Sequence, residues 1–229
     1  MKSLVVLDQV DSTQDEIIRR LKAGTPVDAV MAYEQTAGRG RFGKTWFSPK
    51  DSCLALSLVW HEAIDWPKPE LLALAAGLLA AEVFDVSIAW PNDLMVGEKK
   101  VGGVLSEVVS CGLGRVPVIG LGVNLSMSAP LDGVPWASSM LLEGRPPMLP
   151  LDAATAILDA ATKSEPPTSF EQIHERWMAR DKTPGKAFKT PEGREGTALA
   201  VNTDGSLLLD VDGEEVTVTS AEALYGSGS

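Results

Sequence analysis

Cysteine and histidine are scarce in this sequence, with two residues of each among 229. Cys53 and Cys111 can form at most one disulfide, which excludes the cross-linked framework of small secreted domains. Each lies in or beside an apolar run, so we predict buried free thiols and a reducing, cytoplasmic compartment. His61 and His174 lie far apart in the sequence with no third ligand nearby, which argues against a zinc site.

Long hydrophobic runs and an excess of basic charge are also lacking. No apolar run reaches the roughly 18 residues of a membrane-spanning helix, and the longest, near residues 71–81, is typical of a buried helix. Asp8 and Asp11 interrupt the N-terminal apolar stretch too early for a signal peptide. The net charge is −11, which disfavours the basic face that non-specific nucleic-acid binding requires. We therefore expect neither a membrane nor a nucleic acid as a partner.

One basic stretch stands out against this acidic background. Residues 38–50 read GRGRFGKTWFSPK and have neither a helical nor an alternating apolar period, which predicts a loop. The three glycines allow the backbone to adopt positive φ and to approach a ligand closely. Arg39, Arg41 and Lys44 would supply positive charge for an anion. The alternative is a solvated basic loop on the surface.

Two further segments place polar residues at expected strand ends. The sequence WPND at residues 90–93 offers an amide and a carboxylate for a metal-bound phosphate, although such residues are also common in turns. Lys99 and Lys100 follow, ahead of Gly102 and Gly103, and offer a lysine for a charged group. Residues 120–124, with the pattern GxGxN, end in another amide.

Taken in order, these motifs resemble those of the biotin protein ligases: Ser-Thr near the start, GRGRxGxxWxSP, WPND, a lysine followed by x-Gly-Gly, and GxGxN. The resemblance covers roughly residues 3–225, and the GRGR segment is its most specific part. It implies an α+β fold of the class II synthetase-like, biotin–lipoate ligase type, with a mixed β-sheet, packed helices and a small C-terminal SH3-like barrel. It also implies a catalytic domain over residues 1–183 and a small β-domain over residues 184–229. Catalytic-type sequence begins soon after Met1, which predicts the monofunctional form without a DNA-binding domain.

The resemblance implies ATP-dependent activation of biotin to biotinyl-5′-AMP, with Mg²⁺, and transfer to a lysine of a biotin carboxyl carrier domain. It assigns catalytic roles to Lys100, Arg39 and Arg41. The residues assigned to biotin binding are Ser12, Thr13, Gln14, Gln35, Arg39, Gly40, Arg41, Lys100 and Gly103. The residues assigned to ATP or the adenylate are Arg41, Lys44, Trp46, Asn92, Asp93 and Asn124, with Asp93 also assigned to magnesium.

Several of these residues have competing explanations. Thr13-x-x-Glu16 fits a helix-capping box, and Trp46 suits a buried core as well as an adenine platform. The family usually has lysine before WPND, where this chain has Ala89, so another cation would have to supply that charge. The rival functions are a lipoate ligase and a non-enzymatic biotin sensor. The acceptor carboxylase and the oligomeric state stay open, with a homodimer among the options.

Periodicity predicts the elements that carry these motifs. Helices are expected over residues 13–24, 70–84, 151–163 and 169–180. Strands of the larger unit are expected over residues 3–7, 29–35, 54–60, 86–90, 100–110 and 116–125, with a loop at 61–68 and a turn at 111–115. Strands at 186–189, 196–201, 207–211 and 215–218 would form the small β-domain, which is too small to be secure alone and should pack on the first.

Overall fold

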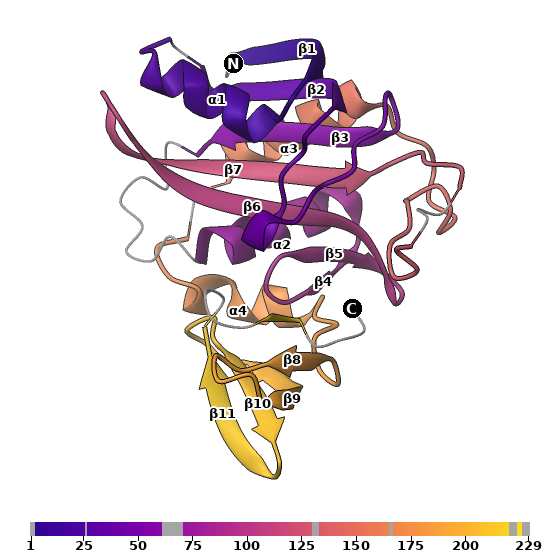
Figure 1. Ribbon diagram of the computed structural model, residues 1–229, viewed down its shortest axis with the longest axis vertical. Helices are drawn as coiled ribbons and strands as arrows, with labels where there is room; N and C mark the ends of the chain where they lie inside the picture. Colours follow the sequence, from indigo (N-terminus) through magenta and orange to yellow (C-terminus); the bar gives the residue numbers. More distant parts are fainter. Residues whose placement is uncertain are drawn as a thin grey trace.

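Two β-sheets form the framework of this computed structural model, which describes residues 3–25, 27–60, 71–129, 133–164, 167–219 and 224–225. The larger sheet has seven strands in the order β1-β2-β3-β7-β6-β5-β4, and the smaller has five in the order β11-β10-β9-β8-β12. The smaller sheet lies beneath the larger one in Figure 1. The large mixed sheet, its packed helices and the small antiparallel sheet confirm the predicted α+β class.

The larger sheet consists of β1 (Leu4–Val10), β2 (Ala29–Gln35), β3 (Cys53–Val59), β4 (Ser87–Ala89), β5 (Asp93–Val96), β6 (Lys99–Cys111) and β7 (Gly114–Asn124). β1 and β2 are parallel, and the remaining neighbours are antiparallel. The smaller sheet consists of β8 (Ala187–Lys189), β9 (Glu195–Val201), β10 (Leu207–Val211), β11 (Glu214–Val218) and β12 (Leu224–Tyr225). The helices are α1 (Thr13–Lys22), α2 (Leu72–Phe84), α3 (Pro150–Lys163) and α4 (Glu171–Met178).

Helix α1 covers one face of the larger sheet. Its buried Ile17 and Leu21 pack with Val59 and Val118 in a separate small cluster. The helix is capped by Ser12, whose hydroxyl accepts from the N–H of Asp15 at 3.4 Å. The predicted cap at Thr13 is therefore wrong by one residue.

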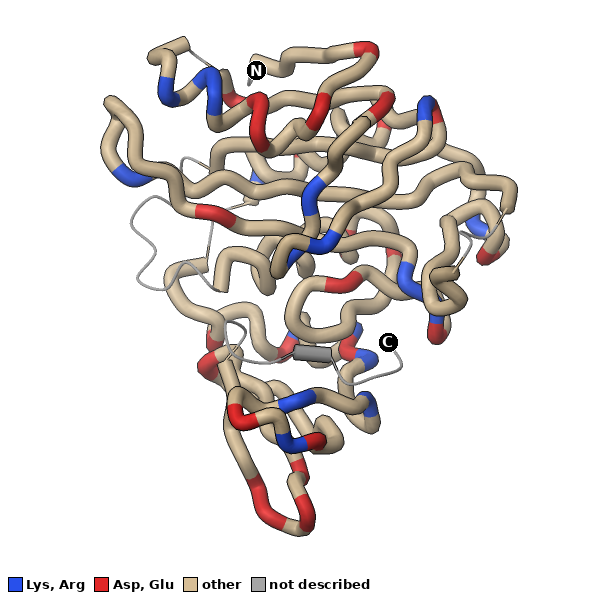
Figure 2. Tube along the Cα trace, viewed as in Figure 1, with Lys and Arg blue, Asp and Glu red and all other residues tan. Residues whose placement is uncertain are grey.

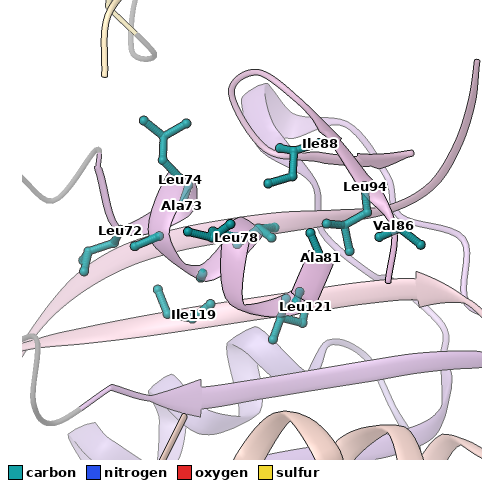
Figure 3. Close-up of a cluster of buried hydrophobic side chains, with 14 of the residues drawn as sticks. Leu72, Ala73, Leu74, Leu78, Ala81, Val86, Ile88, Leu94, Ile119 and Leu121 are labelled. Carbon is teal, nitrogen blue, oxygen red and sulfur yellow. The ribbon is translucent and has the colours of Figure 1, made fainter. Parts of the chain in front are cut away.

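Helices α2 and α3 cover the opposite face, in the main core. Helix α2 is apolar almost all round, and Figure 3 shows its Leu78 and Ala81 above Ile119 and Leu121 of β7. Because successive strand residues face opposite sides of a sheet, Gly120 and its alternate neighbours face the α1 side. Gly120 and Gly122 of β7 therefore lie on the α1 side of the sheet, opposite the main core.

Most predicted elements form with small shifts at their ends, as expected for helix and strand boundaries. The strand β5 was not predicted, because it is too short to show a period and exists by pairing with β4 and β6. The turn predicted at 111–115 is shorter, since Cys111 already pairs with Gly114. The predicted loop at 61–68 and the helix start at Glu70 lie outside the described residues.

The two sheets share one hydrophobic core, so the predicted packing of the small sheet on the larger unit is confirmed. Trp90 contacts the second unit in two ways. Its ring meets that of Phe188 edge-on, with the ring centroids 5.6 Å apart, and its Nε1 donates to the carbonyl oxygen of Gly205 at 3.0 Å. Among the described residues, no helix is long and apolar enough to cross a membrane.

Candidate active site

A cavity of about 600 Å³ lies on the face of the larger sheet that carries α1. Three glycines of β6 and β7, Gly103, Gly120 and Gly122, line it and leave room above the strands. The loop at 38–50 crosses this face, and Figure 2 shows blue segments over the centre of the sheet where the loop passes. The hollow therefore results from glycines on the strands and a covering loop.

Every predicted site residue lines this cavity. These residues are Ser12, Thr13, Gln14, Gln35, Arg39, Gly40, Arg41, Lys44, Trp46, Asn92, Asp93, Lys100, Gly103 and Asn124. Motifs that are widely separated in the sequence thus converge in space. Other lining residues were not predicted as site residues, among them Ser57, Leu105, Trp136 and Lys186. Gly120 and Gly122 also line the cavity and are the two glycines of the GxGxN motif.

Neutral polar groups are linked at the α1 end of the cavity. The N–H and hydroxyl of Thr13 donate to Gln35 Oε1 at 2.9 and 3.1 Å. The hydroxyls of Thr13 and Ser57 lie 3.0 Å apart, and Ser57 donates to Gln14 Oε1 at 3.0 Å. Gln14 Nε2 in turn donates to Glu107 at 2.9 Å. Such a connected network holds its donors and acceptors in fixed orientations.

Arg39 is already paired with protein carboxylates. Its guanidinium lies 2.6 Å from Asp15 and 2.9 Å from Glu107. Burial opposes the charge on Arg39, but the hydrogen bond to Glu107 and attraction from both carboxylates hold its pKa above the usual value. An anion-facing Arg39 was expected from the glycine-rich motif, whereas in the structure its charge is matched within the protein. Neither carboxylate stands in a motif, which is why the sequence analysis missed them.

Charged groups gather at the opposite end of the cavity. Lys100 Nζ lies 2.5 Å from Oδ1 of Asp93, whose side chain is 9% exposed. Arg41 Nη1 donates to Asn92 Oδ1 at 3.2 Å, and Asn92 Nδ2 donates to the carbonyl of Val104 at 2.9 Å. The loop cation is thereby tied to the start of β5.

The two neighbouring lysines lie in different environments. Lys100 lines the cavity, whereas Lys99 is exposed and donates to the carbonyl of Pro135 at 2.7 Å. Alternation along β6 places them on opposite sides of the strand.

Trp46 lies across the glycines of the sheet and belongs to neither hydrophobic cluster. A Cβ at Gly122 would stand 2.4 Å from Trp46 Cε2, so this close approach requires glycine at position 122. Its Nε1 is buried without a hydrogen-bond partner among the described residues. The indole is therefore part of the cavity lining, which separates it from the core alternative.

Asn124 combines a place in the cavity with a structural role. Its Nδ2 donates to the carbonyl of Ser138 at 2.8 Å, and its Oδ1 lies 3.7 Å from the Cys53 sulfur. Burial raises the pKa of the Cys53 thiol to about 12, so this thiol is inert at neutral pH. Cys53 is buried and free as predicted, whereas Cys111 is free but only partly buried.

The spacing of residues 38–45, GRGRFGKT, also matches the P-loop pattern G-x-x-x-x-G-K-[ST]. A P-loop leads into an α-helix whose N-terminus binds phosphate. Here a short 3₁₀ turn, Arg41–Gly43, lies within the loop, and the next regular element is strand β3. The structural context of a P-loop is therefore absent from this described segment.

Comparison with known proteins gives consistent matches. Residues 6–124 match the model of the Biotin/lipoate A/B protein ligase family. The biotin–[acetyl-CoA-carboxylase] ligase of Mycobacterium tuberculosis is 30% identical, over 98% of this chain and 89% of that protein.

Two solved structures are also similar. Biotin protein ligase from Aquifex aeolicus in complex with biotin and ATP has a TM-score of 0.78 at 24% identity, covering 98% of both chains, which shows the fold. Biotin protein ligase from Leishmania major in complex with biotinyl-5-AMP has a TM-score of 0.62 at 27% identity, covering 95% of this chain and 98% of that chain.

Proposed function

We propose that this chain, which belongs to the Biotin/lipoate A/B protein ligase family, is a biotin protein ligase. The observation that carries the proposal is the polarity of the cavity. One end offers neutral donors and acceptors at Thr13 and Gln35, which suit the ureido ring of biotin. The other end offers Asp93 and Lys100, which suit a carboxylate, a metal and phosphates. The similar proteins named above support biotin over lipoate as the substrate.

The first step that we propose joins the two ends of the cavity. An oxygen of the biotin carboxylate attacks the α-phosphorus of ATP, and the bond from that phosphorus to pyrophosphate breaks. The product is biotinyl-5′-AMP. Two anions must be brought together and aligned, so the contribution of the protein is positioning and neutralisation of charge.

We assign Lys100 to the biotin carboxylate and Arg41 to the phosphate that reacts. Lys100 lines the cavity and pairs with Asp93, and Arg41 reaches Asn92 from the loop. Arg39 would reach a ligand by leaving its carboxylates. Biotin is assigned to Ser12, Thr13, Gln14, Gln35, Gly40 and Gly103 as well, and the nucleotide to Lys44, Trp46, Asn92 and Asn124.

Asp93 would hold Mg²⁺, since one carboxylate together with substrate phosphates is a common magnesium arrangement. No cluster of three acidic, histidine or cysteine side chains occurs in the described part of the chain, which fits a metal shared with phosphate. Bound Mg²⁺ would neutralise phosphate charge.

In the second step, the ε-amine of a carrier lysine attacks the acyl carbonyl, loses a proton and displaces AMP. We propose a carrier domain of a biotin-dependent carboxylase as the acceptor, which the name of the Mycobacterium relative supports. Two free thiols suit a reducing cytoplasm. We also propose a division into domains at residues 183 and 184, because the larger sheet ends with β7 and the smaller begins with β8.

Pyrophosphate exchange into ATP tests the first step. The purified chain should catalyse exchange with biotin and Mg²⁺ and should then label a carrier domain. Exchange with lipoate in place of biotin would favour a lipoate ligase. Biotin binding with no exchange would favour a sensor. Absence of both binding and exchange would overturn the proposal.

A further inference from the structure

We propose that Lys186 binds the β- and γ-phosphates of ATP, so that the segment leading into the small sheet contributes a residue to the nucleotide end of the cavity. This proposal depends on the proposed function only in naming ATP as the polyphosphate that binds. Lys186 lines the cavity, although it comes directly before β8 and lies far from every motif in the sequence.

Hydrogen bonds to β4 hold the chain between α4 and β8 beside the cavity. Ile88 N donates to the carbonyl of Arg180 at 2.9 Å, and Lys182 N donates to the carbonyl of Ile88 at 2.7 Å. Trp90 N then donates to Thr183 Oγ1 at 2.8 Å. The bridge between Ile88 and Asp181 is parallel, so the segment continues in the direction of the residues that follow β4.

Backbone bonds fix Lys186 at the end of this path. Its N–H donates to the carbonyl of Thr183 at 3.1 Å, and its carbonyl accepts from Ala198 of β9 at 2.8 Å. Its side chain is 23% exposed, and Nζ lies 3.8 Å from a carboxylate oxygen of Glu98, which is 81% exposed. A long pair of this exposure is weak, so a phosphate can displace Glu98 at little cost.

Two other cations that line the cavity are held more tightly. Lys100 is paired with Asp93 at 2.5 Å, and Arg39, toward the α1 end, is shared by two carboxylates. Ala89, which is buried and lines the same cavity, brings no charge to this side. Lys186 supplies a positive charge there from a different part of the chain.

In-line displacement assigns Lys186 to the leaving pyrophosphate. The leaving oxygen must lie opposite the attacking carboxylate. The sheet order places β2, which carries Gln35, on the opposite side of β7 and β6 from β5 and β4. If biotin binds beside Gln35, pyrophosphate departs toward the β4 side, where Lys186 enters.

Calorimetric titration of ATP and AMP, without biotin, tests this assignment. Lys186→Ala should weaken ATP binding about tenfold or more, as for loss of a charge-assisted hydrogen bond, and leave AMP binding within about twofold. Lys186→Arg should retain most of the ATP affinity. Lys182→Ala is the matched control, because it removes an exposed lysine of the same segment that does not line the cavity. It should bind both nucleotides as the parent does.

Equal losses for ATP and AMP, or no loss for either, would overturn the assignment. A parallel loss of biotin affinity in Lys186→Ala would also overturn it, because that result indicates a structural role. A parent that binds ATP but not biotin would refute the proposed function, while the ATP titrations would still decide the role of Lys186. A parent that binds no ATP would refute both.

Discussion

Gly122 sets the depth of the cavity through the absence of a side chain. The indole of Trp46 occupies the space that a Cβ would need, at 2.4 Å. Gly120 has the same relation to Gln14, whose Oε1 would stand 2.8 Å from a Cβ there. Gly122 and Gly120 of β7 therefore leave room for Trp46 from the loop and for Gln14 from α1.

At the residue scale, Lys100→Ala should slow adenylate formation by about one to two orders of magnitude, because it removes a charge-assisted hydrogen bond of roughly 1.5–3 kcal/mol. It also leaves the buried Asp93 without its lysine, so thermal unfolding must be measured in parallel. Lys99→Ala is the control, and pyrophosphate exchange is the measurement. A severe loss in Lys99→Ala together with normal exchange in Lys100→Ala would contradict the assignment.

Arg41 permits a second test at this scale. Its guanidinium bridges the loop to Asn92, and biotinyl-AMP must be kept from water and stray amines until the carrier docks. Arg41→Gly should retain part of the first step but release the adenylate, so serum albumin added as a bystander should become biotinylated more than with the parent. Complete loss of adenylate synthesis, with no rise in bystander labelling, would show that Arg41 serves the chemistry and not containment.

At the scale of elements, the loop at 38–50 combines unusual backbone with few internal bonds. Phe42 and Gly43 have φ of 54° and 73°. Gly40 N donates to the carbonyl of Lys44 at 2.7 Å, and Trp46 N donates to that of Gly38 at 2.8 Å. Few backbone hydrogen bonds hold a loop that carries several positive charges. Because these charges repel one another, a bound anion is expected to order the loop.

Hydrogen exchange should therefore slow across residues 38–50 when biotin binds, because ligand contacts add to these few backbone bonds. Prior binding of biotin should also raise the affinity for ATP, because the loop is then already ordered when ATP binds. Peptides from the hairpin between β6 and β7 at residues 108–116 serve as the control and should not change. Identical exchange of the loop with and without biotin would argue against ordering.

At the scale of the whole molecule, Asp181 lies in the segment that connects α4 to the smaller sheet and is bonded to the larger one. It pairs with Ile88 across the junction, and its Oδ1 accepts from the N–H and the hydroxyl of Thr183. Burial raises the pKa of Asp181 above its usual value near 3.8. A raised carboxyl pKa means that folding favours the neutral form, so stability is lost as pH rises through the folded pKa.

Asp181→Asn should remove this pH-dependent loss of stability, because the amide does not ionise, and it keeps an oxygen that can accept from Thr183. We expect its thermal midpoint to exceed that of the parent at pH 7 and the difference to shrink toward pH 4. Each kcal/mol of relief corresponds to about 2–4 °C for a chain of this size. Calorimetric scans of both proteins from pH 4 to 7 provide the measurement. A difference that stays constant with pH would exclude titration of Asp181 as its cause.

Local pattern in the sequence determined the elements and the motifs. An apolar stretch predicts α2 wherever it packs, and short alternating runs with turn residues predict the small sheet. The GRGR, WPND and GxGxN segments identified residues that all line one cavity, because each motif carries its own chemistry within a few positions. The motif of a lysine followed by x-Gly-Gly, taken from the resembling ligases, favoured Lys100 over Lys99.

Tertiary structure decided the partners that are distant in sequence. Arg39 meets Glu107, Trp46 rests on Gly122, and Lys186 reaches the cavity only because its segment pairs with β4. None of these contacts leaves a local signal, since each depends on which strands become neighbours and which face a side chain takes. The short strand β5 and the cap at Ser12 belong to the same class, because packing selected them among local alternatives of similar energy.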